Sequence, residues 1–209
     1  MKIPLVKNTI NKNDIDKLID WLRTYPRLTK GELTVEFEKQ WASFIGTKYS
    51  VFVNSGSSAN LLMLYTLIEA GKLKKGDTVI VPAVSWATDL APVVQLGLNP
   101  VLCDCNLEDL SVDLSHLEKI CKENSPSALI VVSILGLVPK MDKILDICRK
   151  YNVIPLEDAC ESFGSRHNGK NLGSFGLMGT FSTYFGHHLS TIEGGVITTD
   201  DRDIYNILK

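Results

Sequence analysis

Two adjacent histidines, His187 and His188, close a run of small and aromatic residues that begins at Thr180 and reads TFSTYFG. Because an imidazole titrates near neutral pH, it can accept and return a proton during a reaction. A lone histidine is usually structural, but a pair placed where a strand runs into a loop lacks the pattern of a solvated surface. We therefore predict a functional role for this pair.

A segment rich in serine and glycine, Val53–Asn60, leads from an expected strand into an apolar helix. Gly56 and Ser57 allow the backbone to approach an anion closely, and the free amides and dipole of a helix N-terminus favour a phosphate. The same residues also suit a helix that a serine merely caps. The segment alone leaves both interpretations open.

Two further segments end apolar strands: Val81–Thr88, which contains Trp86, and Leu156–Ser162, which contains Asp158. In open α/β sheets, ligands bind outside the carboxyl ends of the strands. A tryptophan there can stack on a flat heteroaromatic ring, although a core or lid position explains it equally well. The acidic pair that ends in Asp158 can bind a protonated pyridine nitrogen, and such an ion pair keeps the pyridine ring able to accept electrons. Alternatively, the pair is the acidic N-terminus of the next helix, where the helix dipole stabilises negative charge.

The apolar pattern predicts the elements that must position these segments. Short β-branched runs predict strands over Ser50–Val53, Thr78–Val81, Pro100–Cys103, Ala128–Ser133, Val153–Glu157, Thr180–Tyr184 and Gly195–Thr199. Helical spacing predicts helices over Lys12–Leu22, Thr34–Ile45, Ser57–Ala70, Leu114–Glu123 and Met141–Tyr151, with another starting near Asp201. Strands that are apolar throughout and separated by helices indicate an α/β fold with a largely parallel sheet covered on both faces.

Composition limits the class of function. The 209 residues are 44% hydrophobic and carry a formal net charge of -2, which gives no electrostatic reason to expect nucleic acid as a partner. Met1–Asp20 lacks the apolar stretch of a signal peptide, and the longest apolar run, Ala128–Val138, is too short to span a membrane. The five irregularly spaced cysteines suit reduced thiols in a cytoplasmic protein. We expect no metal, because Cys103 and Cys105 have no second Cys/His pair nearby.

Taken together, these segments resemble the DegT/DnrJ/EryC1/StrS family of sugar aminotransferases and dehydratases, from near Ile3 to the end of the chain. The resemblance implies the type I, aspartate-aminotransferase-like fold. In that fold an N-terminal segment and a large cofactor-binding domain, with a mostly parallel seven-stranded sheet, precede a small C-terminal domain. Residues 1–209 would supply the segment and the large domain. Because the chain stops at Lys209 inside an expected helix, we expect a longer protein whose small domain is absent here, and, as in the family, a homodimer.

The family's aminotransferases carry a lysine, shortly before a Glu-Gly-Gly, that binds pyridoxal phosphate (PLP) covalently. Aligned on Glu193-Gly194-Gly195, that lysine corresponds to His187, and no lysine occurs between Lys170 and Lys209. The same His-His pair characterises the family's 3-dehydratases of nucleotide-linked 4-keto-6-deoxy sugars, which hold pyridoxamine phosphate (PMP) non-covalently. The resemblance thus implies deoxygenation at sugar carbon 3 in dideoxysugar and lipopolysaccharide biosynthesis. It favours a GDP-linked substrate and implies an amino donor such as glutamate.

Transferred residue by residue, the resemblance gives the cofactor-binding candidates their roles. The cofactor phosphate would be bound by Gly56, Ser57 and Ser182. Trp86 would stack on the cofactor ring, and Asp158 would pair with its pyridine nitrogen.

Three further candidates would act beside the cofactor. Glu161 would support the cofactor site from a neighbouring position, His187 would be the catalytic base and His188 would contact the substrate. The chain departs from the expected pattern at Phe185-Gly186, where bulkier or hydroxyl residues are usual. That departure concerns the pocket beside the sugar and leaves the chemistry unchanged.

Two alternatives stay open. The family's iron–sulfur CDP-4-keto-6-deoxyglucose 3-dehydrase shares the histidine, and its cluster ligands would lie largely beyond Lys209. The other alternative is a catalytically inactive binding protein with the same fold. The joint presence of Trp86, Asp158, Ser182 and His188 argues against such decay.

Overall fold

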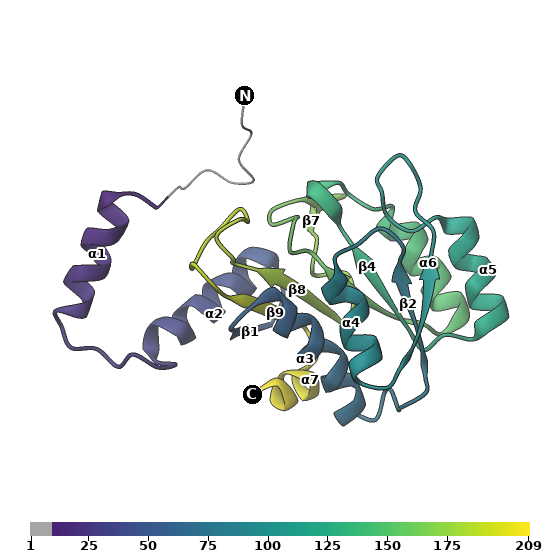
Figure 1. Ribbon diagram of the computed structural model, residues 1–209, viewed down its shortest axis with the longest axis horizontal. Helices are drawn as coiled ribbons and strands as arrows, with labels where there is room; N and C mark the ends of the chain where they lie inside the picture. The colour runs from purple at the N-terminus through teal and green to yellow at the C-terminus, as the bar shows by residue number, and fades with distance from the viewer. Residues whose placement is uncertain (1–9) are drawn as a thin grey trace.

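Seven short, mostly apolar strands build one sheet in the computed structural model, which describes residues 10–209 (Figure 1). The expectations for Met1–Asp20 and for a resemblance that starts near Ile3 fall partly outside this range. Across the sheet the order is β1 (Tyr49–Val53), β9 (Gly195–Thr199), β8 (Met178–Ser182), β5 (Ile154–Asp158), β4 (Ala128–Val132), β2 (Thr78–Pro82) and β3 (Asn99–Cys103). Strand β9 alone runs opposite to the other six, so the predicted, mostly parallel sheet is confirmed.

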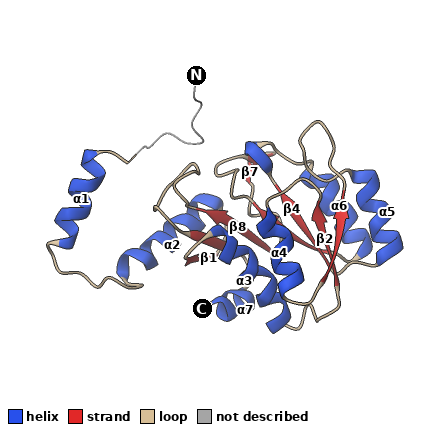
Figure 2. Cartoon of the chain, viewed as in Figure 1, coloured by secondary structure: helices blue, strands red, loops and turns tan. Residues whose placement is uncertain are grey.

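Strand β4 shows why these apolar runs form a buried sheet. All five of its residues are buried. Because successive side chains point to opposite faces, Leu129 and Val131 pack into one core layer, while Ala128 and Ile130 pack into the other. A strand that must be apolar on both faces requires a layer of helices on each side, and Figure 2 shows helices flanking the strands in this way.

The helices α2 (Glu32–Ile45), α5 (Leu114–Asn124) and α6 (Met141–Tyr151) contribute buried residues to the layer that contains Leu129. The opposite layer receives buried residues from α3 (Gly56–Glu69), α4 (Ala87–Gln95) and α7 (Arg202–Leu208). The helix expected near Asp201 is α7, and the Asp201 side chain caps it.

The predicted helices are confirmed to within two residues at each end, whereas one of the strands is displaced. The strand expected at Thr180–Tyr184 lies two residues earlier, because the residues that pair with β5 are 178–180. Sequence analysis missed α4 and the short hairpin of β6 (Arg166–His167) and β7 (Lys170–Asn171). Helix α4 was missed because it contains Pro92, and proline normally interrupts a helix. The hairpin was missed because a strand of two residues is too short to show an alternating pattern.

Helix α1 (Lys12–Leu22) forms where predicted but stands away from the sheet (Figure 1). Its Asn11 cap and capping box satisfy the first turn locally. None of its residues is buried, although Ile15, Leu18 and Leu22 lie on one face at helical spacing.

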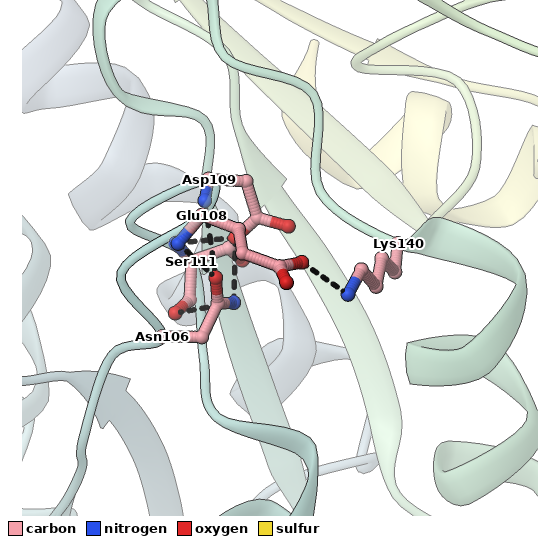
Figure 3. A network of polar contacts seen from close by, with 5 residues as sticks. All are labelled: Asn106, Glu108, Asp109, Ser111 and Lys140. Atoms are coloured by element: carbon pink, nitrogen blue, oxygen red, sulfur yellow. Dashed lines mark hydrogen bonds and ion pairs between the residues drawn. The ribbon is translucent and has the colours of Figure 1, made fainter.

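The loop between β3 and α5 is held by its own side chains and by one ion pair (Figure 3). Asn106 Oδ1 accepts hydrogen bonds from the backbone amides of Glu108 and Asp109, and the Asp109 carboxylate accepts one from the amide of Ser111. Lys140 Nζ lies 2.6 Å from Glu108 Oε2. These contacts tie the loop to the residue that precedes α6.

Three properties of the described residues bear on the function. No helix within 10–209 combines the length and the apolar character that a membrane span requires. All five cysteines are free. No group of three or more histidine, cysteine, aspartate or glutamate side chains in that range is arranged to hold a metal ion.

Candidate active site

The candidate residues converge on one edge of the sheet. Strands β1, β2, β5 and β8 run in the same direction, so their carboxyl ends lie along this edge. The last residues of these strands, and the loops and helices that follow them, carry the residues predicted from sequence, namely Gly56, Ser57, Trp86, Asp158, Glu161, Ser182, His187 and His188. The fold thus gathers segments that are far apart in the chain.

The start of α3 packs directly against the end of β8. Ser55 is the N-cap, and its Oγ accepts a hydrogen bond from the amide of Ser58 at 3.1 Å. A Cβ on Gly56 would lie 2.7 Å from Ser182 Cβ, so only glycine permits this approach. Ser57 is exposed beside it. The structure therefore joins Gly56, Ser57 and Ser182 at a helix N-terminus, the kind of place that attracts an anion.

Asp158 ends β5 as a buried carboxylate, with 5% of its surface exposed. Its Oδ1 accepts a hydrogen bond from the amide of Cys160 at 2.8 Å, and its Oδ2 accepts one from Asn60 Nδ2 at 2.6 Å. Within residues 10–209 no lysine, arginine or histidine forms an ion pair with it. A buried carboxylate that has only neutral donors around it suits a cationic ligand group.

Three residues that sequence analysis did not single out surround Asp158. The amide of Asn60 donates to Asp158 and, at 3.1 Å, to Asp89 Oδ1, while its Oδ1 accepts from Thr180 Oγ1 at 2.6 Å. Asp89 has no exposed surface. A faint signal exists for Asn60, because it lies between Ala59 and Met63 on a buried helix face where an amide needs a polar partner.

Trp86 is the N-cap residue of α4, and its backbone amide donates to Asp89 Oδ2 at 3.2 Å. The side chain is 72% exposed, which excludes the core position that the sequence left open. An indole that is fixed at its backbone and open to solvent on its ring can present a face to a planar ligand.

Glu161 acts between two loops. Its Oε2 accepts a hydrogen bond at 2.8 Å from the amide of Leu135, which lies in the loop after β4 with a left-handed φ of 54°. This contact holds together the loops that follow β4 and β5.

His187 lies half-buried on the loop after β8, and its amide donates to the carbonyl of Tyr184 at 2.9 Å. Burial lowers the pKa of its imidazole, and the charge of His188 lowers it further. The carboxylates of Glu161 and Asp158 oppose this shift. His187 therefore interacts with both acidic residues predicted for the site and favours its neutral, proton-accepting form. His188 is exposed beside it.

The arrangement combines a place for an anion, a buried carboxylate without a cation, an exposed indole and a neutral imidazole. Together these groups can hold a flat, cationic, phosphorylated ring and move a proton beside it. The thiol of Cys160 is close to Gly56 but takes no ionic part, because burial raises its pKa well above the usual value.

Comparison with known proteins gives consistent results. A sequence model of the DegT/DnrJ/EryC1/StrS aminotransferase family matches residues 8–209. The GDP-4-keto-6-deoxy-D-mannose 3-dehydratase of Yersinia pseudotuberculosis is 43% identical over 213 residues, which cover 100% of this chain and 53% of the relative.

Two solved structures of the same kind of enzyme are also similar. The Escherichia coli GDP-4-keto-6-deoxy-D-mannose-3-dehydratase with bound hydrated PLP has a TM-score of 0.93 and 41% identity, over 99% of this chain and 53% of its own. A GDP-4-keto-6-deoxymannose-3-dehydratase with a trapped PLP-glutamate geminal diamine has a TM-score of 0.93 and 40% identity, over 99% and 54%. The chain thus spans about half the length of the relatives that it matches.

Proposed function

Because the chain belongs to the DegT/DnrJ/EryC1/StrS aminotransferase family, we propose that it carries the cofactor site of a PLP/PMP-dependent 3-dehydratase of nucleotide-linked 4-keto-6-deoxy sugars. One observation carries the proposal. The imidazole of His187, at the position where the family's aminotransferases have their lysine, lies on the same sheet edge as Asp158, a buried carboxylate without an ion pair in residues 10–209, whose charge raises the His187 pKa against the effect of burial. With no lysine between Lys170 and Lys209, this site can hold its cofactor only non-covalently.

The residues fit the cofactor at both of its charged ends. Gly56 lets the start of α3 pack against Ser182, and with Ser57 these residues would bind the phosphate. Asp158 would pair with the pyridine nitrogen. A cation at that nitrogen would compensate a buried charge that the described protein residues leave unpaired.

The exposed ring of Trp86 would stack on the cofactor ring, and Glu161 would hold the neighbouring loop in place. When bound in its amine form, the cofactor would supply a primary amine for the keto group at carbon 4 of the sugar and a ring that accepts electrons. The carboxylate of Asp158 keeps the ring nitrogen protonated, which strengthens that sink.

His187 would move the proton. Its lowered pKa leaves the imidazole neutral and able to remove a proton from the carbon next to the cofactor amine. The imidazolium so formed could then protonate the hydroxyl that leaves carbon 3 as water. His188, exposed beside it, would contact the sugar.

The relatives guide the choice of substrate and donor. The similar enzymes named above act on a GDP-linked sugar, and one was captured with glutamate joined to PLP. We therefore favour a GDP-linked 4-keto-6-deoxy sugar, with glutamate as amino donor, in the synthesis of dideoxysugars for lipopolysaccharide. A cytoplasmic homodimer, without nucleic acid or membrane as partner, completes the proposal.

The visible absorption spectrum of the purified protein is the first test. The proposal predicts a cofactor band alone. Added iron–sulfur bands would favour the CDP-sugar dehydrase, and a protein that takes up no PLP would favour an inactive binding protein.

A direct assay follows. With PLP, glutamate and GDP-4-keto-6-deoxymannose, we expect release of ammonia and a sugar nucleotide that lacks the hydroxyl on carbon 3. Transfer of an amino group to carbon 4 with no loss of water would contradict the dehydratase proposal.

A further inference from the structure

The carboxyl groups of Asp89 and Asp158 are both buried, with 0% and 5% of their surface exposed, and they share one amide. Asn60 Nδ2 donates to Asp89 Oδ1 at 3.1 Å and to Asp158 Oδ2 at 2.6 Å. Asn60 is itself fixed, because its Oδ1 accepts from Thr180 Oγ1 at 2.6 Å. The two acids therefore belong to one buried network that joins α3, α4 and β5.

No cation of the described chain compensates this network. Neither Asp89 nor Asp158 forms an ion pair with a lysine, arginine or histidine of residues 10–209. Burying one unpaired carboxylate is already costly, and two at this spacing cannot both stay ionised without a large further cost. A single proton on the pair removes most of that cost.

We propose that Asp89 is a positioning residue of the cofactor site and that Asn60 holds it near Asp158 as a pair that binds one proton between them, so that the buried pair carries a single negative charge. The part that concerns the cofactor rests on the proposed function. The sharing of the proton is a property of the protein alone. A single charge on the pair matches the single positive charge of a protonated pyridine nitrogen.

Asp89 also reaches the other residue proposed to contact the ring. Its Oδ2 accepts from the backbone amide of Trp86 at 3.2 Å, so one side chain fixes the start of α4 and, through Asn60, the carboxylate of Asp158. Loss of Asp89 should therefore disturb the stacking residue and the nitrogen-binding residue together.

The electrostatics of the pocket agree with this geometry. Burial raises the pKa of Asp89 to about 9, with further increases from the charge of Asp158, from a side-chain hydrogen bond to it and from Glu161. Only the Trp86 amide opposes them. The other titratable groups of the pocket are Cys160, whose pKa burial also raises, and His187.

The sign of the effect on stability follows from linkage. Folded protein keeps a proton on Asp89 that the unfolded chain releases near its ordinary value of 3.8. Stability from this group is therefore fully present below that pH and is lost as pH rises toward about 9. One proton corresponds to a factor of about ten in the folding equilibrium constant for each pH unit.

The test compares urea unfolding of wild type and Asp89→Asn, without cofactor, between about pH 5 and about pH 8. Asparagine cannot titrate, and the one accepted N–H bond that its NH₂ group gives up should cost the same at every pH. We expect the folding equilibrium constant of wild type to fall, relative to the variant, by up to about tenfold per pH unit. The control Asp113→Asn, at the N-cap of α5, should differ from wild type by the same small amount across this range, because asparagine caps a helix as well as aspartate does. Parallel curves for wild type and Asp89→Asn would overturn the shared proton.

PLP titrations of the same proteins test the positioning role. We expect Asp89→Asn to bind PLP within about threefold of wild type at neutral pH, and Asp89→Leu to bind at least about tenfold more weakly, a loss of about 1.4 kcal/mol. Unchanged affinity in Asp89→Leu would overturn the positioning role. If wild type binds no PLP at all, the proposed function fails while the result on the proton stands by itself.

Infrared spectroscopy keeps the proposal testable if Asp89→Asn does not fold. Wild type at neutral pH should show the C=O band of a protonated carboxyl, and in Asp158→Asn that band should disappear at a lower pH because the like charge beside Asp89 is gone. This response to Asp158→Asn separates Asp89 from any other buried acid. Absence of the band in wild type, or a band that ignores Asp158→Asn, would overturn the proposal.

Discussion

The substitution Gly56→Ala tests how closely α3 and β8 must approach to form the phosphate end of the site. The new Cβ would lie 2.7 Å from Ser182 Cβ, 3.0 Å from Cys160 Sγ and 3.3 Å from Ser182 Cα. Carbon atoms in contact are normally about 3.5 to 4.0 Å apart, so the methyl group overlaps Ser182 Cβ by about 1 Å. Because one obstacle is backbone, the first turn of α3 must move. We expect a loss of about 1–3 kcal/mol in the free energy of unfolding.

The displacement should also weaken binding of PLP, because the phosphate would contact both sides of the widened gap. We expect the dissociation constant for PLP to rise at least about tenfold, which corresponds to about 1.4 kcal/mol. Urea unfolding and a spectroscopic PLP titration measure the two effects. In the double variant with Ser182→Gly, the 2.7 Å contact is gone, so stability should recover in part while affinity for PLP does not.

A matched control exists at Gly31, which also lies at a helix N-terminus. A Cβ there meets only the carbonyl oxygen of Thr29, at 3.5 Å, which is an ordinary contact. Gly31→Ala should leave PLP affinity unchanged. If Gly56→Ala binds PLP as tightly as wild type does, then the approach of α3 to Ser182 has no part in holding the phosphate.

Three further predictions concern the acids and the base. Asp158→Asn should lower kcat by about 100-fold or more, or about 2.7 kcal/mol in barrier height, because the ring nitrogen loses the charge that keeps it protonated; an unchanged kcat would remove Asp158 from the mechanism. Since burial lowers the pKa of His187, the acid limb of kcat/KM should lie below 6.5 and move lower still in Glu161→Gln; a limb above 6.5 would contradict a neutral base. The buried carboxylate of Glu157 accepts hydrogen bonds from the backbone N–H of Gly173 and of two neighbouring residues. In Glu157→Gln the new NH₂ group should face one of these donors, and the free energy of unfolding measured in urea should fall by about 1–3 kcal/mol; an unchanged urea midpoint would show that these bonds contribute nothing.

The sheet and much of the candidate site could be predicted because their signals are local. Strands such as Ala128–Val132 are apolar throughout, and a strand with that pattern needs cover on both faces. Asp158 ends a strand, and Gly56 and His187 lie within five residues after one, so the topology that aligns the strands also brings these residues to one edge.

The buried polar network could not be predicted because its contacts are not local. Asn60 and Asp158 are 98 positions apart, and Asp89 lies in a helix that Pro92 conceals from pattern analysis. Nothing in the sequence indicates that an acid in the first turn of that helix faces inward, since acids in first turns usually face solvent and the helix dipole. Helix α1 differs in the opposite way: its apolar face is typical of a buried helix, but no other part of residues 10–209 covers that face.

We propose that the site holds its cofactor without a covalent lysine and that His187 occupies the position of that lysine. Borohydride reduction in the presence of PLP, followed by intact-mass measurement, tests it most directly. We expect no reduced PLP adduct on wild type, and one adduct, located at residue 187, on His187→Lys. An adduct on a lysine of the wild-type protein that forms in proportion to cofactor binding would show that a lysine binds the cofactor and that His187 does not take its place.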